Sequence, residues 1–266
     1  MSQDRPALPA EDITALARFA ERLADAAAAV TLPAFRRPHD VTNKESGGFD
    51  PVTAADRGAE EALRALIEAE YPDHAIHGEE FGHKTTDSRF QWVLDPIDGT
   101  RSFITGVPLW GTLIALKLDG EPLIGVIDQP YLKERFVGTP DGTTLNGTPI
   151  RTRACRDLST ATLITTDPDL FDDTEYRAFR TVRAQVRLTR YGMDCYAYAL
   201  LALGQLDVVV EAGLEPYDMM ALIPVVRGAG GVITDWHGNT AGDSHRLLAL
   251  SDPALMGQVL PHLAHC

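Results

Sequence analysis

Two aspartates, Asp95 and Asp98, stand three residues apart at the end of an apolar run in the sequence WVLDPIDGT. The run Trp92, Val93 and Leu94 predicts a buried strand that ends at the first aspartate. Carboxylates this close repel each other and lose hydration on burial, unless a cation lies between them. Hard carboxylate oxygens without a nearby His or Cys cluster favour Mg²⁺ over Zn²⁺. The spacing therefore predicts a pair of metal ions.

The residues after Asp98 are suited to hold an anion. Pro96 fixes the backbone after the first aspartate, and Gly99 permits a close approach just before a predicted helix. Free backbone N–H groups at Gly99 and Thr100 can then hold an anion. Hydrolysis of a phosphate monoester needs this combination, because a metal neutralises charge and activates water.

Further acids lie at predicted element ends, from which they can reach a common cleft. They are Asp50, Asp56, Glu79, Glu80 and Asp218. Aspartate is a favoured helix N-cap, and acids stabilise helix N-termini. Taken singly, each of these residues is explained at least as well by local structure.

The overall composition excludes several classes of protein. Hydrophobic residues make up 44% and charged residues 23%, which is ordinary for a globular protein, and the net charge of −14 disfavours nucleic acid. The three cysteines, Cys155, Cys195 and Cys266, show no CxxC spacing and are typical of reduced thiols in a cytosolic protein. No apolar run approaches the roughly 18 residues of a membrane span. The N-terminus is polar and acidic, so we expect a cytoplasmic protein without membrane or nucleic-acid partners.

Hydrophobic periodicity predicts antiparallel strands in the first half and alternating units in the second. Helices are predicted at 11–32, 54–70, 174–183, 194–203, 217–228 and from Asp252 onward. Strands are predicted at 75–77, 91–94, 111–117, 123–128, 135–138, 161–166, 186–188, 207–211, 231–234 and 247–250. Asp119-Gly120 and Asn146-Gly147 predict hairpin turns, and residues 39–53 a polar loop. This pattern indicates layered α/β structure with two sheets. We expect one domain over 1–266, with subregions 1–150 and 151–266.

Over about residues 40–250, the sequence resembles the inositol monophosphatase superfamily of Mg²⁺-dependent, lithium-sensitive phosphatases. The matching motifs are Asp50-Pro51-Val52-Thr53 with Asp56, Gly78-Glu79-Glu80, Asp95-Pro96-Ile97-Asp98-Gly99-Thr100, and Tyr217-Asp218 with Gly228-Ala229-Gly230-Gly231. The resemblance implies a layered αβαβα sandwich of the inositol monophosphatase and fructose-1,6-bisphosphatase type. It also implies a homodimer.

The resemblance implies two Mg²⁺ sites. Glu79, Asp95 and the carbonyl of Ile97 would bind one ion. Asp95, Asp98 and Asp218 would bind the other.

It implies roles for the surrounding residues as well. Thr100, hydrogen-bonded to Asp50, would help Glu79 orient and deprotonate the attacking water. The N–H groups of Gly99 and Thr100 would hold the phosphate of a small phosphorylated substrate. Lys44 would approach the metal region electrostatically.

Three departures from the inositol-type pattern look like the histidinol-phosphate phosphatase branch. They are the runs Arg101-Ser102-Phe103-Ile104-Thr105-Gly106, Glu215-Pro216-Tyr217-Asp218 and Arg190-Tyr191-Gly192-Met193-Asp194. Histidinol phosphate carries an ammonium group, which favours a nearby carboxylate.

Asp194 and Glu211 are the candidates for binding that ammonium group. The alternative for Asp194 is that it caps a helix, and inositol-type enzymes can also have an acid at the position of Glu211. Arg101 could reach a substrate group, pair with an acid or make a dimer contact. We expect hydrolysis of histidinol phosphate to histidinol and phosphate, a step of histidine biosynthesis. The alternative is an inositol-1-monophosphatase or a broad-specificity inositol and nucleotide phosphatase.

Overall fold

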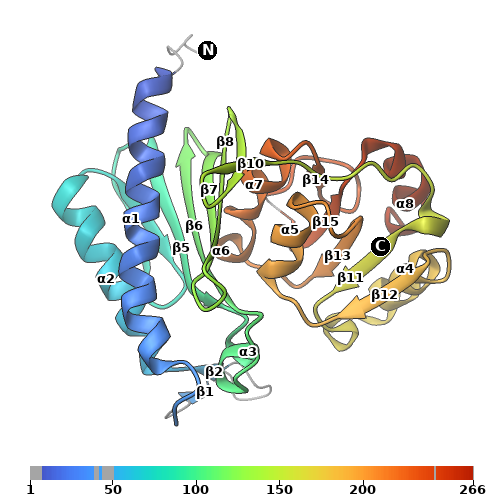
Figure 1. Ribbon diagram of the computed structural model, residues 1–266, viewed down its shortest axis with the longest axis horizontal. Coiled ribbons are helices and arrows are strands. Elements are labelled where there is room, and N and C mark those ends of the chain that lie inside the picture. The colour runs from blue at the N-terminus through green and yellow to red at the C-terminus, as the bar shows by residue number, and fades with distance from the viewer. Residues whose placement is uncertain (1–7, 39–41, 44–50, 243, 266) are drawn as a thin grey trace.

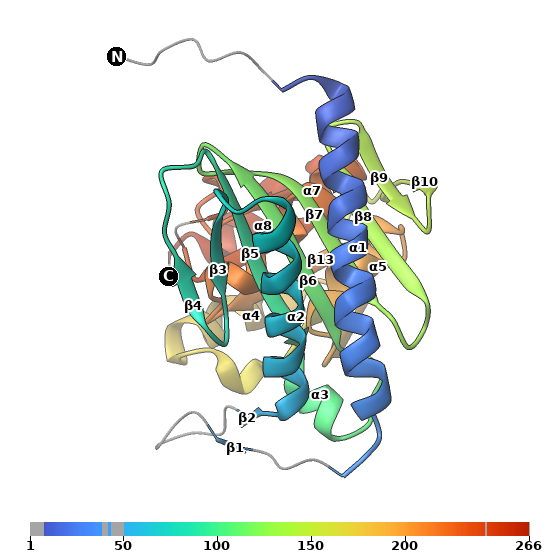
Figure 2. The same cartoon turned by 90° about the vertical axis from the view of Figure 1, so that its left-hand side faces the viewer.

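The computed structural model describes residues 8–38, 42–43, 51–242 and 244–265. Two long helices, α1 (Ala10–Ala34) and α2 (Ala54–Glu70), lie side by side across one face of a large sheet (Figures 1 and 2). Helix α2 has the predicted bounds. It begins at a capping box in which Ala55 N–H donates to Thr53 Oγ1 (3.1 Å) and Thr53 N–H donates to Asp56 (2.9 Å). The local explanation of Asp56, as a residue that stabilises a helix start, is confirmed.

The large sheet has eight strands in the order β10-β9-β8-β7-β6-β5-β3-β4. Their bounds are β3 Ala75–Gly78, β4 Gly82–Lys84, β5 Phe90–Asp98, β6 Gly111–Leu118, β7 Glu121–Gln129, β8 Glu134–Thr139, β9 Gly142–Leu145 and β10 Thr148–Ile150. Strand β3 runs parallel to β5, and all other neighbours are antiparallel. Both predicted hairpin turns are present: Asp119 and Gly120 have φ of 52° and 91°, and Asn146 and Gly147 have φ of 49° and 79°.

Strand β5 extends beyond its predicted end at residue 94. It continues through Asp95 to Asp98, and its register with β6 shifts between these two residues. A bulge of this kind bends a strand and changes the direction of its side chains. The two aspartates therefore both leave the strand at an irregular point, where neither is confined to one face of the sheet.

A second sheet of five strands has the order β12-β11-β13-β15-β14. Its strands are β11 Thr162–Thr165, β12 Leu188–Tyr191, β13 Val208–Ala212, β14 Val232–Thr234 and β15 Arg246–Leu250. The second half also contains α4 (Asp173–Arg183), α5 (Cys195–Ala202), α6 (Pro216–Met219), α7 (Leu222–Gly228) and α8 (Met256–Leu263). A short pair, β1 (Thr42–Asn43) and β2 (Pro51–Val52), lies within the segment predicted as a loop.

Three hydrophobic cores lie between the layers and hold them together. One joins α1 and α2 to the large sheet, the second surrounds α5 and α7 between the two sheets, and the third joins the small sheet to α4 and α8. Figure 1 shows the same succession of helices, sheet, helices, sheet and helices. The predicted αβαβα sandwich is confirmed. The strands of the large sheet end at Ile150, near the predicted boundary of the subregions, while the single domain itself stays a prediction.

The predicted helix 217–228 is wrong as a single helix. The structure divides it into α6 and α7, with a turn at Met220 and Ala221. The division coincides with a close approach to the large sheet, because a β-carbon at Gly125 would overlap the carbonyl oxygen of Ala221. Within the described ranges, no helix is long and apolar enough to cross a membrane.

Candidate active site

Three of the predicted metal ligands meet between the large sheet and α6. Asp95 and Asp98 come from the irregular end of β5, and Asp218 comes from the first turn of α6. One carboxylate oxygen from each lies within 4.8 Å of the other two. Asp95 is only 2% exposed, and the other two are half-buried.

Burial and mutual repulsion disfavour the charged forms of these carboxylates. Burial raises the pKa of Asp95 well above its usual value, and Glu79, Asp98 and Asp218 raise it further. Burial and the Asp98 carboxylate likewise raise the pKa of Asp218. Burial also raises the pKa of Asp98, although an N–H from Cys195 (2.6 Å) opposes that shift. A hard divalent cation would remove the repulsion, so the donor set fits Mg²⁺.

Glu79 lies next to Asp95, as predicted. Its N–H donates to the carbonyl of Leu94 (3.2 Å), and its side chain hydrogen-bonds to Asp95. Thr100 Oγ1 donates to the carbonyl of Ile97 (3.1 Å). Asp50 and Lys44 lie outside the described residues, so their predicted contacts stay predictions.

Gly99 connects the metal group to the substrate pocket. It has φ of 79° and directly precedes α3 (Thr100–Ile104), the predicted helix, whose first turn has N–H groups without helical partners. A β-carbon at Gly99 would lie 2.9 Å from Cγ of Asp194. Both the left-handed backbone and this contact require glycine here.

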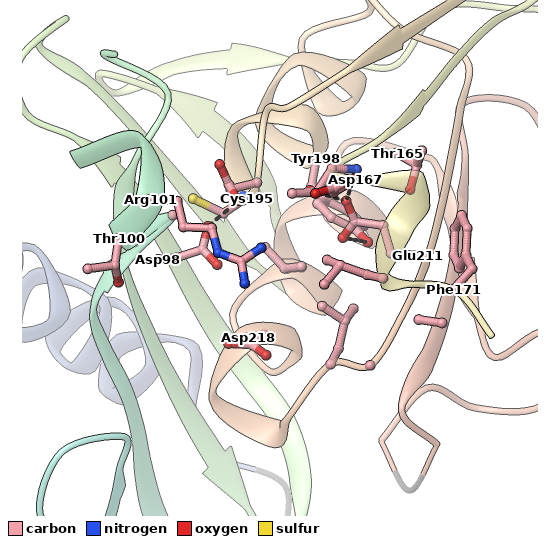
Figure 3. A pocket seen from close by; sticks show the side chains of 18 residues that line it. Asp98, Thr100, Arg101, Thr165, Asp167, Phe171, Cys195, Tyr198, Glu211 and Asp218 are labelled. Carbon is pink, nitrogen blue, oxygen red and sulfur yellow. Dashed lines mark hydrogen bonds between the residues drawn. The ribbon is translucent and has the colours of Figure 1, made fainter. Parts of the chain in front are cut away.

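Beside the three acids lies a pocket of about 250 Å³. Figure 3 shows Asp98 and Thr100 on one side and Glu211 and Phe171 on the other, with Arg101 extending between them. The first side is formed by β5 and α3, and the second by the ends of β11 and β13.

Asp194 lies in this pocket in a strained backbone conformation, with φ of 46° and ψ of −140°. Among the described residues its side chain makes no cap hydrogen bond with α5, so the helix-cap explanation is wrong. Instead, Ser102 Oγ donates to its carboxylate (3.1 Å). Burial, Asp98 and Glu211 raise the pKa of Asp194 to about 8, while Arg101 has the opposite effect. Strained residues persist where the surrounding structure fixes them, often at binding sites.

Glu211 also lines the pocket and is 5% exposed. It accepts hydrogen bonds from Thr166 Oγ1 (2.5 Å), Thr166 N–H (3.1 Å) and Tyr198 Oη (3.0 Å). Burial raises its pKa to about 7 despite these donors. The structure therefore brings the predicted substrate residues Gly99, Thr100, Arg101, Asp194 and Glu211 to one pocket.

Several pocket residues were missed in the sequence. Cys195, expected only to be a reduced thiol, lies on the pocket wall and its amide contacts Asp98. Ser102, which does not line the pocket but donates to Asp194, stands in a run that departs from the inositol-type pattern, and this departure was the available signal. The apolar residues Leu170, Phe171 and Leu214 gave no signal, because apolar side chains are expected in any fold.

Comparisons with known proteins identify the family of this chain. The model of the inositol monophosphatase family matches residues 12–266. The bifunctional phosphatase IMPL2 of Arabidopsis thaliana is 52% identical over 231 residues, which are 85% of this chain and 66% of that protein. This chain thus spans slightly less than two thirds of that relative.

A histidinol-phosphatase of Chlorobaculum parvum is 39% identical over 224 residues, 83% of this chain and 86% of that protein. A solved structure of an inositol monophosphatase from Zymomonas mobilis is 44% identical. It superimposes with a TM-score of 0.87 and covers 97% of this chain and 100% of that one.

Proposed function

Because this chain belongs to the inositol monophosphatase family, we propose that it is a Mg²⁺-dependent phosphomonoesterase that hydrolyses histidinol phosphate to histidinol and phosphate. The family and the relatives indicate a phosphatase that acts on a small phosphorylated substrate. The histidinol-phosphatase relative supports the finer assignment, which would place the chain in histidine biosynthesis.

The observation that carries the substrate assignment is the pair of acids, Asp194 and Glu211, that line the pocket beside the metal group. Their carboxylates accept hydrogen bonds from the hydroxyl groups of Ser102, Thr166 and Tyr198 and from the N–H of Thr166, and the Arg101 guanidinium lowers the pKa of Asp194. An ammonium group would bring a further cation to these two carboxylates, and a charge-assisted hydrogen bond to a carboxylate is strong. Inositol offers only hydroxyl groups and would bring no positive charge to either acid.

Glu79, Asp95, Asp98, Asp218 and the carbonyl of Ile97 would hold the metal. Bound Mg²⁺ would neutralise charge on the phosphate and lower the pKa of a water molecule.

The remaining residues would act on water and phosphate. Glu79, with Thr100 and Asp50, would orient the attacking water and accept its proton. The N–H groups of Gly99 and Thr100 would hold the phosphate oxygens. Arg101, which is exposed and lines the pocket, would contact the substrate.

Substrate preference tests the proposal directly. The purified protein should show a higher kcat/KM for histidinol phosphate than for inositol 1-phosphate, and EDTA should abolish both activities. A preference for inositol 1-phosphate would instead establish the second candidate, which the 44% identity to an inositol monophosphatase favours. Comparable values for several esters would establish a broad-specificity phosphatase.

We also propose a cytoplasmic homodimer that associates through an apolar patch at the end of α1. The patch consists of Leu32, Val107, Tyr131 and Leu132, which are 38–41% exposed. Arg36 connects its parts, because Nη1 donates to Tyr131 Oη (2.7 Å) and Nε donates to the carbonyl preceding Val107 (3.0 Å). Contiguous exposed apolar residues mark interaction surfaces, and the resemblance names a second copy as the occupant.

Light scattering after size exclusion tests this surface. The protein should elute as a dimer, and Leu132→Asp should shift it toward monomer. Leu188→Asp, at a residue 47% exposed on the distant β12, is the matched control and should leave the dimer intact. A dimer unaffected by Leu132→Asp would place the interface elsewhere.

A further inference from the structure

Glu60 is a buried acid that the proposed chemistry does not use. It lies on α2 and is 0% exposed. A buried carboxylate is costly unless several donors compensate for its lost hydration. The hydrogen-bond partners of Glu60 therefore indicate what a buried carboxylate does at this position.

Those partners belong to the turn that carries Glu79. Glu80 N–H donates to Oε2 of Glu60 (2.7 Å), and Phe81 N–H donates to Oε1 (3.2 Å). Arg64, one helical turn along α2, donates Nε to Oε1 (2.7 Å) and Nη2 to the carbonyl of Gly82 (2.5 Å). The Glu60–Arg64 pair thus holds both sides of the turn between β3 and β4, which lies beside α2 in Figure 2.

The turn has the shape that this arrangement needs. A β-carbon at Gly78 would overlap Oε1 of Glu60, so the absence of a side chain there lets the carboxylate reach the amides. Gly82 closes the turn with φ of 64°. On the other side, the N–H of Glu79 is fixed to the carbonyl of Leu94, the residue before Asp95.

We infer that Glu60 is a positioning residue for the metal site. It presents Glu79 to Asp95 by holding the backbone amides on the far side of the turn, and it does not itself bind the metal. The inference rests on the metal-binding role of Glu79 in the proposed function. Residues that orient metal ligands typically change metal affinity by about 10- to 100-fold when they are replaced.

Glu60→Gln tests the inference, because the amide group would place N–H donors against backbone N–H donors. Mn²⁺ binding, measured by electron paramagnetic resonance without substrate, should weaken by about 10- to 100-fold. Hydrogen exchange of the amides of Glu80 and Phe81 should accelerate in the metal-free protein. The matched control is Glu61→Gln, at the exposed neighbouring acid on α2, which should leave both measurements unchanged.

Gly78→Ala provides a second test if Glu60→Gln does not fold. The added methyl group would displace the Glu60 carboxylate while keeping its charge, and it should weaken Mn²⁺ binding to a similar degree. Wild-type Mn²⁺ affinity and unchanged exchange in a folded variant would overturn the role of Glu60 alone. A wild-type protein that binds Mn²⁺ but prefers another ester would contradict the histidinol assignment and leave the role of Glu60 intact.

Discussion

Asp95 and Asp218 reach the same point from β5 and α6, and their raised pKa values show the cost of placing them together without a cation. Asp95→Asn and Asp218→Asn should each lower kcat by more than about 100-fold, because an amide does not replace a carboxylate bound to a metal. Steady-state kinetics over a Mg²⁺ titration measure the effect. The matched control is Asp141→Asn, at an exposed aspartate beside β9, which should retain wild-type kinetics. Substantial turnover in either site variant would contradict the metal assignment.

Asp194 provides the sharpest test of substrate recognition. Asp194→Asn keeps the size of the side chain and an acceptor for Ser102, but it removes the charge. Loss of one charge-assisted contact costs about 1.5–3 kcal/mol, so kcat/KM for histidinol phosphate should fall roughly 10- to 100-fold. A neutral-alcohol phosphate ester should be turned over almost as before.

The difference between the two substrates decides the role of Asp194. Equal losses on both esters would indicate a general effect on the pocket, and no loss on either would remove Asp194 from recognition. Asp169→Asn, at an exposed aspartate near the pocket rim, is the matched control and should affect neither substrate.

At the scale of elements, the contact between β7 and the α6–α7 turn holds the large sheet against the middle layer. Gly125→Ala would drive a methyl group into the carbonyl of Ala221, and backbone cannot rotate away as a side chain can. Overpacking of this kind costs typically 1–3 kcal/mol, so the free energy of unfolding should fall by about 3 kcal/mol in urea titrations.

Gly257 is the control glycine. It lies in α8 with no atom within 4 Å of an added β-carbon. Gly257→Ala should therefore leave stability unchanged or raise it by about 0.5–1 kcal/mol. A Gly125→Ala protein as stable as wild type would show that the two layers can separate without cost.

Local sequence patterns predicted some elements correctly and others wrongly. Helix α2 was predicted to the residue, because its cap and apolar spacing are local features. The division of the helix at Met220 and Ala221 coincides with a contact to a strand almost a hundred positions earlier, and no local sequence pattern reports such a contact. Strand β12, predicted at 186–188, lies at Leu188–Tyr191. It is an edge strand with mainly exposed side chains, so little burial marks its register.

The candidate site was predicted unevenly for a similar reason. Asp95, Asp98 and Asp218 were found because charged residues at element ends stand out in a sequence. Glu60 looked like any other acid on a helix, and its role depends on amides from a different strand pair. The side chain that accepts hydrogen bonds from the N–H groups of a turn cannot be identified until the position of that turn in the fold is known.

At the scale of the whole molecule, the clustered acids make stability depend on pH and metal together. Carboxyl groups with raised pKa values keep protons in the folded state that the unfolded chain releases near the ordinary aspartate pKa of 3.8. Their stabilising contribution is therefore present at low pH and is lost as pH rises through the folded pKa values.

Thermal unfolding followed by circular dichroism measures this linkage. In EDTA, Tm should fall as pH rises from about 5 to about 8, because Glu211 and Asp194, whose pKa values are raised to about 7 and about 8, ionise over this range beside the other acids of the site. Saturating Mg²⁺ should raise Tm most at the higher pH, because it neutralises the ionised carboxylates. Asp95→Asn should reduce both effects. A metal-free protein that becomes more stable over this pH range would contradict the electrostatic account of the site.

The pocket wall is divided between layers: Asp98 and Thr100 come from the large sheet and α3, whereas Leu170, Phe171 and Leu214 come from segments around the small sheet. Because the two sides come from different layers, substitutions on one side can change which phosphate ester is preferred without altering the other side. A combinatorial library at those three apolar positions would remodel the substrate-facing wall while leaving every acid of the metal group in place. After gene duplication, a descendant could therefore acquire a new alcohol leaving group by drift on one side of the pocket, with the ancestral hydrolytic chemistry inherited unchanged on the other.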